Sequence, residues 1–163
     1  MLLSLLINNK TMKRILITTL LISASLLAAA QEKRPEYDST LARKLGADER
    51  GMKTYILVIL KTGPAIIEDK ELRDSLFTGH FSNMDKLAKE GKLVAAGPFD
   101  DNESQYRGLF LFDVRTMDEA RQLVKGDPTI TSGIFKTEFY QWYGPAAVSM
   151  LNEIQKKIQK RQP

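Results

Sequence analysis

The chain of 163 residues contains no cysteine and only one histidine, His80. The absence of cysteine excludes disulfides, a thiol nucleophile, cysteine metal ligands and an acylated lipoprotein anchor. The sequence also lacks a Gly-x-Ser-x-Gly nucleophile motif, a glycine-rich phosphate loop and a dinucleotide fingerprint. We therefore expect no cofactor and no metal. The candidate catalytic groups are the single imidazole and the carboxylates.

The first thirty residues have the pattern of a secretory signal peptide. Lys13 and Arg14 precede an apolar run at 15–27, and three alanines follow at 28–30, which predicts cleavage after Ala30. The pattern begins better at Met12 than at Met1, so we expect the native start at Met12. An uncleaved membrane anchor is the alternative, although an apolar core of ~13 residues is short against the ~20 that span a bilayer. The expected location is periplasmic or secreted, with membrane contact only through an uncleaved signal segment.

The positive charge of the chain lies mostly in this leader. Three basic residues and no acidic ones fall within residues 1–30, out of a formal net charge of +4. Within 52–145, acidic residues outnumber basic ones by two. This balance argues against a nucleic-acid partner, which requires a basic surface.

The remaining sequence predicts one compact domain at 52–145, preceded by an exposed arm at 31–51. Dense β-branched and aliphatic runs predict strands near 54–60, 93–99, 107–114 and 133–143, and helical spacing predicts helices at 69–89 and 116–125. The order strand, helix, strand, strand, helix, strand is typical of an α+β ferredoxin-like sandwich (βαββαβ) with an antiparallel four-stranded sheet. Gly79 interrupts the first helix and predicts a kink near Thr78.

One face of such a sheet is left without helices, and six aromatic residues can supply apolar area there. They are Phe110, Phe112, Phe135, Phe139, Tyr140 and Trp142. We expect a second copy of the chain to cover that face, giving a homodimer with a dimeric α/β barrel-type assembly.

The C-terminal segment at 146–163 predicts a short amphipathic helix. Its apolar residues recur at three- and four-residue spacing: Val148, Leu151, Ile154 and Ile158. We expect this stripe to dock on the domain or on the dimer partner. Binding to a membrane surface is the alternative.

His80 lies in an apolar helical stripe beside Phe77 and Met84, where an imidazole must find a partner or line a cavity. If Asp127, or the pair Asp100 and Asp101, reaches this helix face, the result is a general base with an orienting acid. If none does, His80 is a packed structural residue.

Each candidate carboxylate also has a structural interpretation. An aspartate before proline, as at Asp127, often ends one helix and caps the next turn. The acidic segment at 100–103 reads as a solvated loop, and a divalent-cation site there is the minority interpretation because no EF-hand spacing is present.

Several short motifs occur together in an order that resembles the YciI-like family, also called the YCII-related domain. They are Gly79-His80, Lys89-Glu90-Gly91-Lys92-Leu93, Ala95-Ala96-Gly97-Pro98, Gly108, Glu119-Ala120 and Gly126-Asp127-Pro128 followed by Gly133. The resemblance covers about residues 54–142. It implies a ferredoxin-like dimer with a pocket that holds a histidine and an aspartate as an acid/base pair, and a lyase-type elimination is among the family's few assigned activities.

By this resemblance, His80 and Asp127 are the expected catalytic pair. Gly97, Pro98, Asp100 and Asp101 are the expected binding residues. We therefore expect an exported small-molecule enzyme of the lyase or hydrolase type. The alternative is a non-catalytic module that binds a small ligand or serves as a structural dimer.

Overall fold

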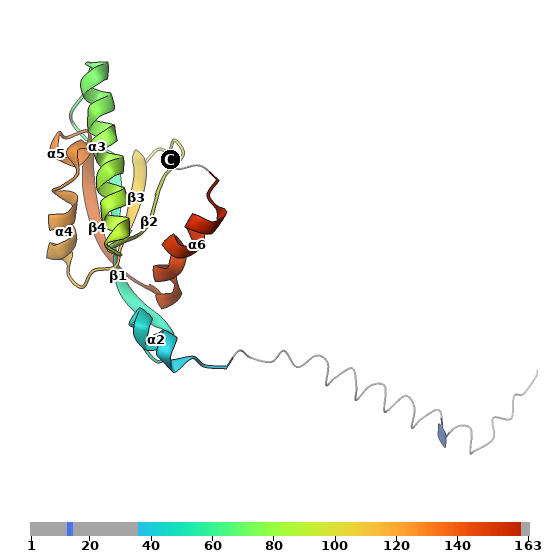
Figure 1. Ribbon diagram of the computed structural model, residues 1–163. Coiled ribbons are helices and arrows are strands. Elements are labelled where there is room, and N and C mark those ends of the chain that lie inside the picture. The colour runs from blue at the N-terminus through green and yellow to red at the C-terminus, as the bar shows by residue number, and fades with distance from the viewer. Residues whose placement is uncertain (1–12, 15–35, 161–163) are drawn as a thin grey trace, which may run out of the picture. The chain divides into compact units, whose positions relative to one another are not determined.

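The computed structural model describes residues 13–14 and 36–160 (Figure 1). The chain divides into two units, Met1–Tyr37 and Asp38–Pro163. Apart from Lys13 and Arg14, the predicted signal peptide and the start of the predicted arm lie outside the described residues. No helix in the described part of the chain has the length and apolar character needed to cross a membrane.

The second unit is built on a four-stranded sheet. The strands are β1 (Met52–Thr62), β2 (Leu93–Pro98), β3 (Tyr106–Phe112) and β4 (Phe135–Pro145). Their order in the sheet is β2-β3-β1-β4, and every neighbouring pair is antiparallel. The aliphatic run of β1 occupies an inner position, as its burial requires. The predicted α+β arrangement with an antiparallel four-stranded sheet is confirmed, and its order is that of a ferredoxin-like fold.

Three helices lie between strands along the chain: α3 (Lys70–Lys89), α4 (Met117–Val124) and α5 (Pro128–Thr131). Each begins at a side-chain cap, since Asp69, Thr116 and Asp127 accept hydrogen bonds from backbone N–H groups of the first turn. Leu87 of α3 and Val124 of α4 enter the main core with residues of β1, β2 and β3. The helices therefore cover one face of the sheet (Figure 1).

The predicted kink in the first helix is wrong, because α3 is a single helix of 20 residues that passes through Gly79. A Cβ atom at Gly79 would lie 2.6 Å from Cγ of Pro128. The glycine therefore serves a close approach between α3 and α5. It does not mark a break in α3.

The prediction that six aromatic residues face away from the helices is wrong for four of them. Phe110 and Phe112 are 3% and 0% exposed in the helix-covered core, and Phe135 and Phe139 pack against that core. Cross-strand partners share a face, and β1 residues of this core pair with Phe110, Phe112 and Phe139. On the opposite face lie Tyr140 and Trp142.

The opposite face has a smaller cluster of its own, formed by Tyr55, Val94 and Leu111. Val148 packs against it from a short 3₁₀ helix, η1 (Ala146–Met150). The Tyr55 hydroxyl lies 3.0 Å from the carbonyl oxygen of Pro145, which ties the end of β4 to this cluster.

Two further helices flank the domain, α2 (Ser39–Leu45) before β1 and α6 (Leu151–Ile158) after η1. Asn152 of α6 donates from Nδ2 to the carbonyl oxygen of Leu93 at 2.7 Å. Within the described chain, Leu151, Ile154 and Ile158 of the predicted apolar stripe stay exposed. Val148 is the stripe residue that packs on the domain.

Candidate active site

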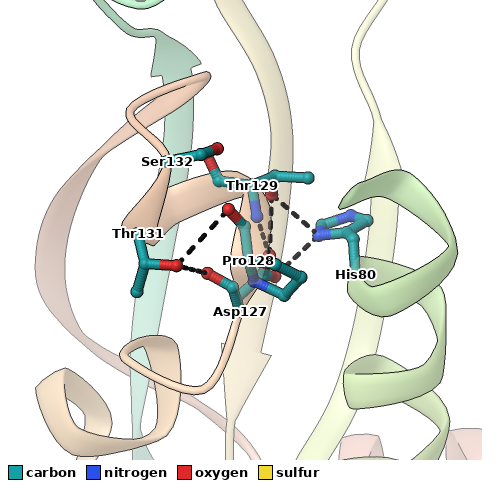
Figure 2. A network of polar contacts seen from close by, with 6 residues as sticks. All are labelled: His80, Asp127, Pro128, Thr129, Thr131 and Ser132. Carbon is teal, nitrogen blue, oxygen red and sulfur yellow. Dashed lines mark hydrogen bonds and ion pairs between the residues drawn. The ribbon is translucent and has the colours of Figure 1, made fainter. Parts of the chain in front are cut away.

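His80 and Asp127 meet between α3 and the start of α5. Nδ1 of the imidazole lies 2.6 Å from Oδ2 of the carboxylate, and both side chains are buried. Figure 2 shows the ring on α3 pointing toward the turn that carries Asp127, Pro128 and Thr129. The two residues are 47 positions apart in sequence, so their contact depends on how α3 packs against α5.

The turn that presents Asp127 is set by local sequence. Asp127 is the N-cap of α5, and Pro128 occupies the first turn, where its missing N–H is not needed. Oδ1 of Asp127 accepts from the backbone N–H of Thr129 at 3.0 Å and from its hydroxyl at 2.7 Å. Because capping uses Oδ1, Oδ2 remains available for the imidazole. The capping role and the pairing role of Asp127 therefore coexist.

These contacts decide the charge of Asp127. Burial by itself would raise the pKa of the carboxyl group, but the hydrogen bonds from His80 and Thr129 outweigh it and hold the pKa below its usual value. The side chain is thus a carboxylate, and it requires a donor at Nδ1 of His80. The Thr129 hydroxyl oxygen, 3.2 Å from Nδ1, completes the surroundings of that nitrogen. A neutral imidazole then carries its proton on Nδ1 and its lone pair on Nε2.

The second ring nitrogen, Nε2, has no hydrogen-bond partner among the described residues. Among the described residues, no fully buried side-chain nitrogen or oxygen lacks a hydrogen-bond partner. Nε2 of His80 makes no hydrogen bond within that part of the chain, so it retains accessible surface. His80 also lines a cavity of about 200 Å³. The lone pair of Nε2 is therefore available to a bound molecule.

Aromatic rings surround the imidazole. The ring centroids of Phe77, Phe81, Phe110 and Phe135 lie 5.3 to 6.1 Å from that of His80. The cavity is lined by Leu60, Phe77, His80, Phe81, Met84, Gly97, Pro98, Arg107, Gly108, Leu109, Phe110 and Phe135. A larger hollow of about 440 Å³ between α3, β2 and α6 shares two of these residues, Phe81 and Met84.

The structure brings together some of the predicted site residues and not others. Gly97 and Pro98 line the cavity with His80. Asp100 and Asp101 are exposed in the loop after β2 and are absent from the lining. Asp101 forms an exposed ion pair with Arg107 at 3.1 Å. Of the aspartates considered from sequence, Asp127 is the one that reaches the imidazole.

Sequence reasoning missed two residues of the site, Thr129 and Arg107. A threonine two positions after a capping aspartate could have indicated the first, because Asx turns reach the backbone two residues on. No sequence signal marks Arg107, since its place at the cavity follows from strand pairing. The described residues hold no cluster of three or more potential metal ligands.

This arrangement supports proton transfer. A carboxylate that accepts from Nδ1 fixes the tautomer of the imidazole and stabilises the imidazolium once Nε2 has taken a proton. The surrounding rings limit the access of water, which strengthens the electrostatic interaction of the pair.

Comparisons with known proteins find a family and two similar proteins. A Bacillus subtilis protein described as uncharacterized protein YjpA is 24% identical over 91 residues, which covers 56% of this chain and 95% of the relative. A solved structure, the 5-chloro-2-hydroxyhydroquinone dehydrochlorinase TftG from Burkholderia phenoliruptrix in complex with 2,5-dihydroxybenzoquinone, has 20% identity and a TM-score of 0.41. The match covers 54% of this chain and 92% of that one. The family described as YCII-related domain matches residues 54–142, which contain both His80 and Asp127. This chain belongs to the YCII-related domain family.

Proposed function

We propose that this protein is a small-molecule enzyme of the lyase or hydrolase type that uses His80 and Asp127 as its acid/base pair. The observation that carries the proposal is the 2.6 Å contact between Asp127 Oδ2 and His80 Nδ1, with Nε2 left accessible at a cavity. A histidine held only for packing needs no unpaired nitrogen at such a surface.

In the lyase form of the reaction, Nε2 removes a proton from a substrate carbon next to an electron-withdrawing group. The electron pair of the C–H bond becomes a carbon–carbon double bond, and the leaving group on the neighbouring carbon departs with its bonding electrons. Asp127 stabilises the imidazolium formed at this step, and the proton then passes to the leaving group or to water. A positioned general base of this kind contributes about 10²- to 10⁴-fold in rate.

The test compares the native chain with His80→Asn on a panel of small carboxylic acids and their halogenated derivatives. The asparagine amide can still donate to Asp127, whereas the base at Nε2 is lost. We expect halide or double-bond formation by the native chain and a decrease of about 10²-fold or more in His80→Asn. Ser82→Ala, an exposed change on the same helix, should retain native rates. Equal rates in the native and His80→Asn proteins would remove His80 from the chemistry.

The alternative function is binding without turnover, and the aromatic surroundings of His80 favour it as the second candidate. Saturable binding of a panel compound by both proteins, with no product from either, would select this alternative over the enzyme.

We also propose that the protein is a homodimer in which a second copy covers the sheet face opposite the helices. Leu57, Leu109, Tyr140 and Trp142 on that face are half-buried or exposed in the single chain. Sedimentation at micromolar concentration should give a dimer, and a monomer would contradict the proposal.

Export is the remaining part of the proposed function, and it rests on the basic, apolar and small-residue pattern of residues 13–30. Mass spectrometry of the protein recovered from its native cells should give an N-terminus at Gln31. An intact leader on the whole population would contradict cleavage.

A further inference from the structure

We propose that Arg107 binds an anionic group of the substrate, and that the substrate is a one-ring organic anion. This inference rests on the proposed function, because it names the molecule on which His80 would act. It is carried by the residues that share the His80 cavity and by their charges.

The size and walls of the cavity suit one planar ring. Its volume is about 200 Å³, and an apolar protein cavity of roughly 150 Å³ is large enough to bind benzene. Phe77, Phe81, Phe110 and Phe135 present ring faces and edges around the imidazole. Aromatic side chains pack well against another ring in stacked or edge-to-face geometry. A longer substituent would extend past Phe81 into the neighbouring hollow.

Among the described residues that line this cavity, Arg107 is the one with a permanent charge, and His80 has the other polar side chain. Its position depends on an irregularity in the sheet. The register shifts between Leu60 and Lys61, so that Leu60 pairs with Gly108 while Lys61 pairs with Tyr106. Arg107 is the extra residue at this bulge. Bulges of this kind redirect a side chain and recur beside active sites.

The present partner of Arg107 is easily displaced. Its guanidinium lies 3.1 Å from Oδ1 of Asp101, and the two side chains are 46% and 96% exposed. An ion pair so open to water is weak. A substrate carboxylate or phenolate held beside the phenyl rings would meet the same guanidinium with less competition from solvent, and it could form two parallel hydrogen bonds. Asp101 then acts as a competitor of the substrate anion.

The proposal places two requirements on the substrate. Its anionic group must reach Arg107 while the atom that loses a proton reaches Nε2 of His80, and both residues line the same cavity. A neutral ring lacks the first contact, and a small anion without a ring lacks the contacts with phenylalanine.

The test measures binding of benzoate, benzamide and acetate by calorimetry or ligand-observed NMR. We expect saturable benzoate binding by the native chain and weaker binding of both other probes. Arg107→Gln should weaken benzoate binding roughly tenfold without changing benzamide binding, and Arg107→Lys should recover part of the loss. Asp101→Asn should strengthen benzoate binding. The matched control, Arg115→Gln, removes the same charge at a residue outside the cavity lining and should have no effect.

Benzamide binding as tightly as benzoate, no benzoate binding by the native chain, or an equal loss in Arg107→Gln and Arg115→Gln would overturn the proposal. Benzoate carries no leaving group for this elimination, so its binding is measured without turnover. Binding data therefore test Arg107 independently of turnover. If His80→Asn and the native chain are equally active, the proposed chemistry fails while the anion site stands.

Discussion

Two aspartates in turns, Asp127 and Asp100, lie in opposite environments. Each lies in a turn after a regular element, Asp127 after α4 and Asp100 after β2. Asp127 is 0% exposed, and both of its carboxylate oxygens accept hydrogen bonds. Asp100 is exposed, and its carboxylate makes no hydrogen bond within the described residues. The comparison shows that the packing of α3 across the turn makes Asp127 an orienting acid, because it buries the carboxylate against His80.

The two aspartates also differ in the free-energy cost of burying the carboxylate. Removing a carboxylate from water is costly unless hydrogen bonds replace the lost hydration. At Asp127, contacts from His80 and Thr129 provide that replacement, and the pKa of the carboxyl group stays below its usual value despite burial. At Asp100, water provides the solvation and no such arrangement is needed.

The largest effect is expected for Asp127→Asn. The amide oxygen can still cap α5, but an amide NH₂ facing Nδ1 forces the imidazole proton onto Nε2 and removes the base. We expect kcat/KM to fall by about 10²- to 10⁴-fold. Because the chain has one histidine, its imidazole ¹⁵N signals report the tautomer directly.

The contrast between the two aspartates would be contradicted if Asp100→Asn lowered kcat/KM as much as Asp127→Asn. We expect Asp100→Asn to stay within about twofold of native activity, in line with a surface change. A native-like tautomer in Asp127→Asn would contradict the orienting role of the carboxylate.

A smaller effect is expected from Gly79→Ala. This change acts on the packing of α3 against α5, which gives Asp127 an environment different from that of Asp100. The new Cβ would lie 2.6 Å from Pro128 Cγ, so α3 and α5 must move apart. We expect a loss of about 1–3 kcal/mol in the free energy of unfolding, as in other overpacked sites, and a longer His80–Asp127 contact. Denaturant unfolding measures the first, and the imidazole ¹⁵N spectrum reports the second.

Pro128→Ala offers a matched rescue of this change, because it removes the atom that Gly79→Ala would meet. The double variant should recover most of the lost stability, giving a coupling energy between the two positions. Additive losses would show that the glycine matters for a reason other than its approach to Pro128.

The smallest effect is expected on the free energy of unfolding when the pH is lowered. The pKa of Asp127 is lower in the folded chain than its usual value, so the unfolded chain takes up this proton first as the pH falls. The contribution of Asp127 to stability is thus present above about pH 4 and is lost as the pH drops through the folded pKa. Unfolding free energies measured across this range should fall more steeply for the native chain than for Asp127→Asn. Asp100→Asn should follow the native curve, and parallel curves for all three would contradict the assignment.

Much of the fold could be predicted because its signals are local. Neighbouring residues determine the aliphatic run of β1, the Thr116 cap of α4 and the turn at Asp127-Pro128. His80 stood out because it is the sole histidine and lies on an apolar stripe. From the residues, its pairing with Asp127 depended on whether that aspartate reaches the helix face of His80. The family resemblance implied the same pair.

The errors came from contacts between distant segments. Alternation along a strand indicates which residues share a face but not which face the helices cover, so the sequence does not place Phe110 and Phe112 on the helix-covered side. Gly79 predicts a kink when only its neighbours in sequence are considered, because its partner Pro128 is far away in sequence. Arg107 gave no signal because a register shift against β1 brings it to the cavity.

Local sequence accounts for the order of strands and helices, the capping turn at Asp127 and the apolar setting of His80. These depend on periodicity and on hydrogen bonds within a few residues. Tertiary packing brings Asp127 to the imidazole, leaves Asp100 and Asp101 in water, and places His80 and Arg107 at one cavity. Those outcomes depend on the approach of α3 to α5 and on the register of β3, which bring together groups from distant parts of the chain.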